Sequence, residues 1–234
     1  MTEKNNQPVL KFLNVEKIFP GAPPVHALNK VSLEIKRGDF AALIGPSGSG
    51  KSTMLNLAAG LDVPTHGTVE IGGQDVSRLS QNELCRVRRE RLGFIFQSYN
   101  LFPVLTAVEN AEYTCVMRGD NRQLARERAL RALEAVGLGD KPNRYPTELS
   151  GGQQQRVAVA RALTTEPDFI LADEPTANLD SKTALQLIEL FEELNRSLGV
   201  TFLFSTHDHN LVNRVRRQLE MRDGELHETL QASH

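Results

Sequence analysis

The sequence lacks any apolar run that approaches the ~20 residues needed to span a bilayer. Its first residues, MTEKNNQPVLKF, also lack the apolar core of a secretory signal. If the protein serves a membrane process, we therefore expect another chain to supply the membrane-spanning part. Cysteine is scarce as well, because the 234 residues contain only Cys85 and Cys115, which form no CxxC pair. Reduced thiols in the cytosol are expected rather than a disulfide.

An excess of positive charge is also absent. The formal net charge is −2 at pH 7, which disfavours nucleic acid as a partner. The densest basic cluster, residues 86–91, includes an interleaved glutamate and is interpreted as a solvated helix face. The length fits a single domain over residues 1–234, and 40% apolar residues are enough for a sizeable core.

The order of predicted elements indicates an α/β fold. Strand patterns alternate with helix patterns after Gly93, which predicts a parallel sheet covered on both faces. The strands predicted before Gly45, at residues 9–19, 31–35 and 40–44, are expected to be antiparallel. Residues 97–150 are predicted to be mostly helical and to form an insertion between core strands.

The segment from Gly45 to Ser52 reads GPSGSGKS and matches the phosphate-binding loop pattern G-x-x-x-x-G-K-[ST]. Its glycines allow successive N–H groups to point inward, and the helix predicted after it adds a positive N-terminal end. A flexible Gly/Ser turn is the alternative, but a strand before the loop and a helix after it favour a site for ATP and Mg²⁺. Lys51 is expected to reach the β- and γ-phosphates, Ser52 to bind Mg²⁺ and Thr53 to help hold the α-phosphate. The expected nucleotide contacts are Gly45, Ser47, Gly48, Gly50, Lys51, Ser52 and Thr53.

A second motif is a predicted strand, residues 169–172, that ends in Asp173 and Glu174. Open α/β sheets bind ligands at the carboxyl ends of their strands. Asp173 is expected to hold Mg²⁺ through water, and Glu174 to polarise the attacking water as a general base. Two solvated acids at a strand end are common, so the phosphate loop is needed to favour this interpretation.

A third motif, Leu149 to Gln153, reads LSGGQ and is interpreted as a second anion site. Ser150 offers a hydroxyl, while Gly151 and Gly152 let the backbone close on a phosphate at a helix N-terminus. A plain helix N-cap is the alternative, which the continuation QQRVA disfavours.

With these three motifs in this order, the chain resembles the ATP-binding subunit of an ABC transporter over nearly its whole length. The resemblance implies a P-loop core with a mostly parallel sheet, an antiparallel β subdomain and a helical subdomain at about residues 98–150. It also implies that LSGGQ binds the γ-phosphate held by the opposite subunit. Two ATP molecules would then be sandwiched in a homodimer, with contacts from Ser150, Gly151, Gly152 and Gln153.

Further roles follow from the resemblance alone. Gln97 would contact Mg²⁺ or the attacking water and sense a transmembrane partner. His207 would touch the γ-phosphate, and Asp180 would belong to a loop that reports across the dimer. Phe19 would stack on adenine, for which a π face suffices. Every expected catalytic position is filled, which argues against an inactive scaffold.

The segment from Gly93 to Asn110, together with GPSGSGKSTMLN, is similar to ATPases of the lipoprotein-release and macrolide-export (LolD/MacB) group. This similarity implies an FtsX/MacB-like transmembrane permease with few membrane helices and a large external domain. The ATPase would be peripheral on the cytoplasmic face of the inner membrane. Residues 99–105 would line the groove for the permease's coupling helix, with local core packing as the alternative.

Two other assignments stay open. An importer ATPase shares parts of the pattern. A soluble ABC ATPase of DNA repair or translation usually carries two cassettes, a long coiled coil or a zinc-binding insertion, none of which is visible here. In this architecture the permease and its partners would determine the transported substrate.

Overall fold

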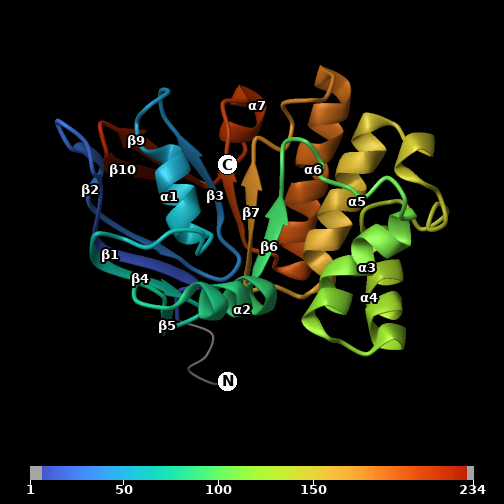
Figure 1. Ribbon diagram of the computed structural model, residues 1–234. Helices are drawn as coiled ribbons and strands as arrows, with labels where there is room; N and C mark the ends of the chain where they lie inside the picture. The colour runs from blue at the N-terminus through green and yellow to red at the C-terminus, as the bar shows by residue number, and fades with distance from the viewer. Residues whose placement is uncertain (1–6, 231–234) are drawn as a thin grey trace.

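A mixed six-stranded sheet runs through the middle of the protein, whose computed structural model describes residues 7–230 (Figure 1). Its strand order is β10-β9-β3-β8-β7-β6. Strands β3, β8, β7 and β6 pair in parallel, β9 is parallel to β3, and β10 is antiparallel to β9. The strands are β3 (Phe40–Ile44), β6 (Leu92–Ile95), β7 (Phe169–Asp173), β8 (Phe202–Ser205), β9 (Arg217–Arg222) and β10 (Glu225–Leu230). The parallel sheet predicted from the alternating pattern after Gly93 is confirmed.

Strand β3 corrects one prediction. It was expected to be antiparallel with the other segments before Gly45, but Phe40 pairs with Phe202 and Ala41 with Arg217 in parallel registers. Its sequence, FAALI, is apolar without alternation, and it is covered on both faces. This pattern is typical of a central parallel strand, so β3 belongs to the core sheet.

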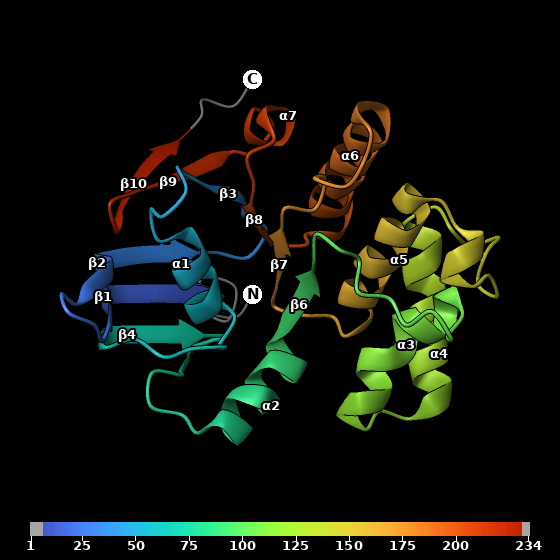
Figure 2. The ribbon, with the colours of Figure 1, turned by 45° about the horizontal axis from the view of Figure 1, so that its top comes forward.

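A separate antiparallel sheet, in the order β2-β1-β4-β5, forms the other β layer. It consists of β1 (Leu10–Phe19), β2 (Val25–Ile35), β4 (His66–Ile71) and β5 (Gln74–Asp75). Helix α1 (Lys51–Ala58) lies between this sheet and the central one, where Met54 and Leu57 are buried with Phe12 and Leu171 (Figure 2). The antiparallel sheet therefore covers the face of the core beside the phosphate loop.

Four long helices cover the other face of the central sheet. They are α3 (Ala107–Arg118), α4 (Arg122–Ala135), α5 (Gly151–Thr164) and α6 (Ser181–Leu198). Helix α6 packs directly on the sheet, where the Phe191 ring centroid lies 5.3 Å from that of Phe202 and 5.2 Å from that of Phe204. Helices α3 and α4 lie farther out and contact the core through α5 (Figure 2).

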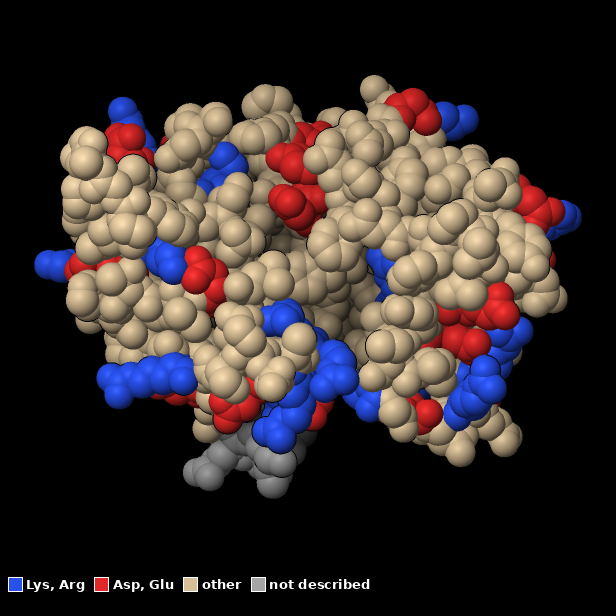
Figure 3. Space-filling view, viewed as in Figure 1, with Lys and Arg blue, Asp and Glu red and all other residues tan. Residues whose placement is uncertain are grey.

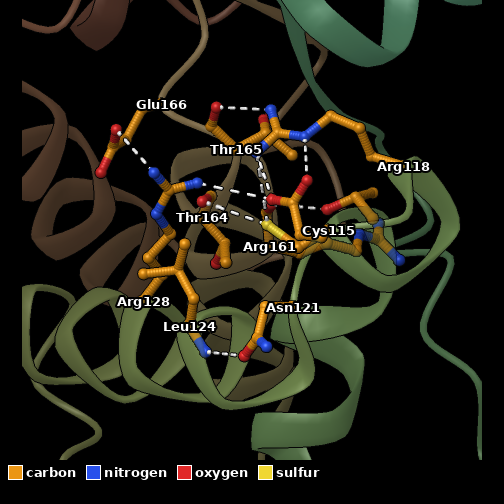
Figure 4. A network of polar contacts seen from close by, with 11 residues as sticks. Cys115, Arg118, Asn121, Leu124, Arg128, Arg161, Thr164, Thr165 and Glu166 are labelled. Carbon is orange, nitrogen blue, oxygen red and sulfur yellow. Dashed lines mark hydrogen bonds and ion pairs between the residues drawn. The ribbon is translucent and has the colours of Figure 1, made fainter.

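A polar network ties α3 and α4 to the C-terminal end of α5 (Figure 4). Arg118 donates to the carbonyl of Thr165 at 3.0 Å and to the Asp120 carboxylate, and its hydrogen bond to Asp120 lowers the pKa of that carboxyl. Cys115 contacts the carbonyl of Thr164, and burial raises the pKa of its thiol. The helical insertion is thus attached by hydrogen bonds as well as by apolar packing.

Smaller predicted features also hold. Helix α2 (Gln81–Arg91) begins with the expected capping box of Ser80 and Glu83. Basic side chains gather around this helix in Figure 3, as expected for a solvated face. Cys85 and Cys115 are both free, as predicted. Helix α7 (His209–Val212) and the 3₁₀ turn η2 (Pro146–Glu148) were not anticipated.

The aromatic cluster under α6 should carry a large share of the core's stability. Phe191 is fully buried, whereas Leu198 on the same helix is 61% exposed. Phe191→Ala is expected to lower the free energy of unfolding by about 3–5 kcal/mol, because it leaves a cavity between α6 and the sheet. Leu198→Ala should change it by about 0.5 kcal/mol or less. Urea unfolding would compare the two, and equal losses would contradict this account of the core.

Candidate nucleotide site

The predicted phosphate loop lies between β3 and α1, at the carboxyl edge of the central sheet, where a cleft of about 470 Å³ opens. The ends of β7 and β8 reach the same cleft, so the first two motifs meet as predicted. Its lining is Phe19, Val25, His26, Ala27, Ser47, Gly48, Gly50, Lys51, Ser52, Thr53, Asp173, Glu174, Ser205 and His207. Val25 to Ala27 were missed by the sequence analysis, because β2 extends six residues closer to the N-terminus than the predicted strand at 31–35.

The phosphate loop is shaped by close contact with the C-terminal hairpin. Gly45 has φ +143°, and a Cβ atom there would lie 2.2 Å from the carbonyl oxygen of Met221. The N–H of Gly224 donates to the carbonyl of Ser49 at 3.0 Å. The hairpin of β9 and β10 thus supports the phosphate loop. Because the Met221 carbonyl lies so close, only glycine fits at position 45.

Charge in the loop favours an anion. Lys51 Nζ donates to the carbonyls of Gly45 at 2.6 Å and Pro46 at 2.9 Å, so the ammonium is held over the loop. The first turn of α1 contains no acidic residue, so the positive end of the helix is not neutralised. Both features place positive charge where the phosphates of a nucleotide are expected.

The strand ends β7 and β8 bring Glu174 and His207 together. The backbone N–H of His207 donates to Glu174 Oε2 at 3.3 Å, and His207 Nε2 lies 3.5 Å from Glu174 Oε1. Glu174 has φ +45°, a left-handed conformation that is costly for this residue, and its N–H donates to Ser205 at 2.8 Å. Strain of this kind is concentrated at functional sites. The Glu174 carboxylate is therefore fixed at the edge of the cleft by the neighbouring strand β8.

The donor set fits Mg²⁺. Ser52 and Asp173 line the same cleft and offer the hard oxygen ligands that this ion prefers. No group of three or more metal-binding side chains occurs within residues 7–230. Mg²⁺ is typically held by one or two protein oxygens together with substrate phosphates, so a sparse set is suitable. Gln97, the other predicted ligand, follows β6 but does not line the cleft.

Phe19 also lines the cleft. Its ring is 40% exposed, and Lys17 Nζ lies 5.2 Å from the ring centroid. An exposed π face at this position suits stacking with a nucleotide base.

The LSGGQ motif forms the N-terminus of α5 and lies outside the nucleotide cleft. Ser150 and Gln153 form a capping box, in which the Ser150 N–H donates to Gln153 Oε1 at 3.0 Å. Within residues 7–230, the lining of the cleft includes none of the five LSGGQ residues, and Asp180 is absent from it as well. The structure therefore does not bring the second anion site to the first within one chain.

A separate apolar groove lies between α2, β6 and α3, and Figure 3 shows it as a hollow near the centre of that face. The rings of Phe94 and Phe96 are stacked, with their centroids 5.3 Å apart, and the ring centroids of Phe102 and Tyr113 lie 4.4 Å apart. Of the predicted stretch 99–105, Asn100 and Phe102 line this groove, while Leu101 packs against the core. Residues of that stretch are therefore divided between the groove lining and the core, and docking of a coupling helix in the groove stays a prediction.

The phosphate loop, the acidic strand end and the parallel sheet define a P-loop nucleotide-hydrolysing cassette. The family pattern described as "ABC transporter" matches residues 28–177. The chain therefore belongs to the ABC transporter family, in which it is an ATP-binding and ATP-hydrolysing subunit. The predicted family, fold and use of ATP are confirmed.

Individual relatives agree with this assignment. The chain is 47% identical over 219 residues to an uncharacterized ABC transporter ATP-binding protein of Thermotoga maritima, with 93% of each chain covered. It is 45% identical to the lipoprotein-releasing system ATP-binding protein LolD of Alcanivorax borkumensis, covering 94% of this chain and 97% of LolD. It is 46% identical to the macrolide export ATP-binding/permease protein MacB of Burkholderia thailandensis, covering 94% of this chain but 34% of MacB.

Solved structures show the same fold. The ATP-binding cassette MJ0796, solved as a dimer in a post-hydrolysis state bound to ADP and Pi, matches with a TM-score of 0.83 and 42% identity. The match covers 96% of this chain and all of that one. Among residues 7–230, none of the helices has the length and hydropathy that crossing a bilayer requires.

The loop contact at Gly45 gives a testable consequence. Gly45→Ala should lower the free energy of unfolding by about 1 kcal/mol for the left-handed backbone and by a further 1–3 kcal/mol, roughly, for the overlap with Met221. It should also weaken binding of a fluorescent ATP analogue, because the loop must move. The matched control is Gly38→Ala, where φ is +77° but no atom lies within 4 Å of the added Cβ. This control should show only the backbone cost and normal ATP binding, and equal effects of the two variants would contradict the proposed fit.

Proposed function

We propose that the chain works as a homodimer that sandwiches two Mg²⁺-ATP molecules beneath a membrane permease of the lipoprotein-release and macrolide-export kind. The single observation that carries the dimer is the separation of the two anion sites. One chain holds the phosphate loop and the acids in one cleft, while Ser150 and the positive end of α5 lie outside it. In a homodimer, each copy can supply its α5 terminus to the cleft of the other copy, so that both clefts are completed.

The chemistry assigned to the cleft is in-line hydrolysis of the γ-phosphate. Lys51 and the loop N–H groups neutralise the phosphate oxygens, while Ser52 and Asp173 would hold Mg²⁺, which would supply further positive charge. Glu174 accepts a proton from the attacking water. The water oxygen bonds to the γ-phosphorus, the bond from the γ-phosphorus to the bridging oxygen breaks, and ADP leaves. His207, which is fixed beside Glu174, contacts the γ-phosphate. Gln97, on the loop after β6, is assigned to Mg²⁺ or the attacking water.

The apolar groove supports the permease as partner. Phe96 and Phe102 are each more than a third exposed there, which is a suitable surface for an apolar helix from another chain. Relatives with similar sequences include LolD, named for lipoprotein release, and MacB, which joins ATP-binding and permease parts. We therefore assign an FtsX/MacB-like permease to this groove and a peripheral position at the cytoplasmic face of the inner membrane. The single-domain organisation, with a helical subdomain at about residues 98–150, belongs to the same proposal.

Two variants test the shared site. Glu174→Gln should lower phosphate release by about 10²-fold or more, because it removes the general base. It should also accumulate as a dimer with Mg²⁺-ATP in size-exclusion chromatography with light scattering. Ser150→Arg, introduced into the Glu174→Gln protein, should prevent this dimer while ATP binding to the monomer stays within about twofold, since the added side chain blocks the partner's cleft. Loss of ATP binding in the monomer would show that one chain completes its own site.

The groove gives a separate prediction. Phe102→Asp should abolish co-purification with the membrane protein encoded beside this chain from detergent-solubilised membranes, because it places a charge in the apolar lining. Val104→Asp is the matched control, since Val104 lies on the same loop, is 78% exposed and does not line the groove. Equal co-purification of both variants would exclude the groove as the docking site. A neighbouring gene for a six-helix importer permease would contradict the proposed subgroup.

A further inference from the structure

Arg161 is a buried cation without a carboxylate partner. It lies near the C-terminal end of α5, and only 7% of its surface is exposed. Within residues 7–230, no acidic side chain pairs with it, and burial lowers the pKa of its guanidinium. A buried charge is costly unless hydrogen bonds replace the lost water, so the contacts that it does make are informative.

Those contacts are two consecutive backbone carbonyls of the loop that follows Gln97. Arg161 donates to the carbonyl of Asn100 at 2.5 Å and to that of Tyr99 at 2.8 Å. Tyr99 and Asn100 have φ values of +57° and +51°, so two non-glycine residues in succession adopt the left-handed conformation. Such a conformation persists only where surrounding contacts enforce it. The fork of the guanidinium provides those contacts.

A second buried side chain of α5 holds the other end of the same segment. Gln155 is fully buried, and its Nε2 donates to the carbonyl of Pro175 at 2.8 Å and to that of Phe96 at 3.4 Å. Phe96 precedes Gln97, and Pro175 follows Glu174. Helix α5 therefore fixes the chain on both sides of Gln97 and connects it to the strand end that carries the proposed base.

The segment is closed from the opposite side by the loop after β7. Asn178 Nδ2 donates to the carbonyl of Gln97 at 3.0 Å, and the Tyr99 hydroxyl donates to the carbonyl of Asn178 at 3.3 Å. The Tyr99 hydroxyl also lies 3.0 Å from the position that a Cβ of Gly151 would occupy. Arg161 and Asn100 in addition line the apolar groove. The loop 97–100 is thus in contact with the groove, the LSGGQ glycines and the loop that contains Asp180.

We propose that Arg161 is a positioning residue for Gln97: by binding the carbonyls of Tyr99 and Asn100 it fixes the backbone of the loop from which Gln97 reaches the nucleotide. The inference rests on the proposed role of Gln97 in hydrolysis. Arg161 itself touches no nucleotide, so its effect should appear in turnover and not in ATP affinity.

A double-mutant cycle on the full-length protein tests this. Gln97→Ala, Arg161→Met and the double variant are compared for kcat and KM in phosphate release, with ATP affinity measured in the Glu174→Gln background. Arg161→Met should lower kcat about tenfold and leave ATP affinity within about twofold. The double variant should be no slower than Gln97→Ala alone, because both changes remove the same contribution. Arg161→Lys, which retains the charge but lacks the fork, should lie between Arg161→Met and the parent.

The matched control is Arg156→Met on the same helix. Arg156 is half-buried and donates to the carbonyl of Val136 at 2.9 Å, away from the loop 97–100. Its kcat should stay within about twofold of the parent. If Arg161→Met does not fold, as judged by circular dichroism, the exposed Asn178→Ala variant takes its place in the cycle, since it frees the carbonyl of Gln97.

The outcomes distinguish a failure of the proposed role of Gln97 from a failure of the proposed role of Arg161. If Gln97→Ala has the parent's kcat, the proposed role of Gln97 fails and this inference fails with it. If Gln97→Ala is slow but the Arg161→Met or Asn178→Ala loss multiplies with it, the role of Gln97 stands and this inference alone is overturned. A rise in KM with unchanged kcat for Arg161→Met would also overturn it.

Discussion

Burial of helix α5 on several sides at once is the constraint on which the rest of the structure depends. Val157 to Ala160 are all fully buried, because the helix packs against β6 and the sheet on one side and against α3 and α4 on the other. A helix held in this way cannot shift by itself, so its N-terminus at Ser150 and its buried polar groups keep fixed positions relative to the core. The start of α5, where the second anion site is proposed, and the loop beside Arg161 therefore belong to one rigid unit.

This packing also explains why the start of α5 does not line the nucleotide cleft of its own chain. The cleft forms where β3, β7 and β8 end, and its charges come from the phosphate loop and the acids that follow β7. The α5 terminus does not line that cleft, and contacts with β6, α3 and α4 hold the helix in place. Completing the cleft from within one chain would require α5 to leave the core, whereas a second copy can supply its terminus without any such change.

Much of this arrangement could be predicted from the sequence, because the relevant signals are local. The capping box at Ser80, the glycine pattern of the phosphate loop and the amphipathic face of α6 each depend on neighbours within a few residues. The capping box at Ser150 was not predicted, because an N-cap was the disfavoured alternative there. The direction of β3 was predicted wrongly, since it depends on partners in β8 and β9 that lie more than 150 residues away. The roles of Gln155 and Arg161 were not anticipated either. Their acceptors are backbone carbonyls, which carry no residue-specific signal, and a polar residue in a helix pattern gives no indication of its partner.

The contact between the phosphate loop and the C-terminal hairpin has a consequence for how the protein is made. Gly45 rests against Met221, and Ser49 accepts a hydrogen bond from Gly224, so residues near position 50 take their final shape only against residues near position 220. During synthesis these two regions leave the ribosome far apart in time. The nascent chain thus carries the phosphate-loop motif early, but the loop gains its structural support only after residues near position 220 have been made.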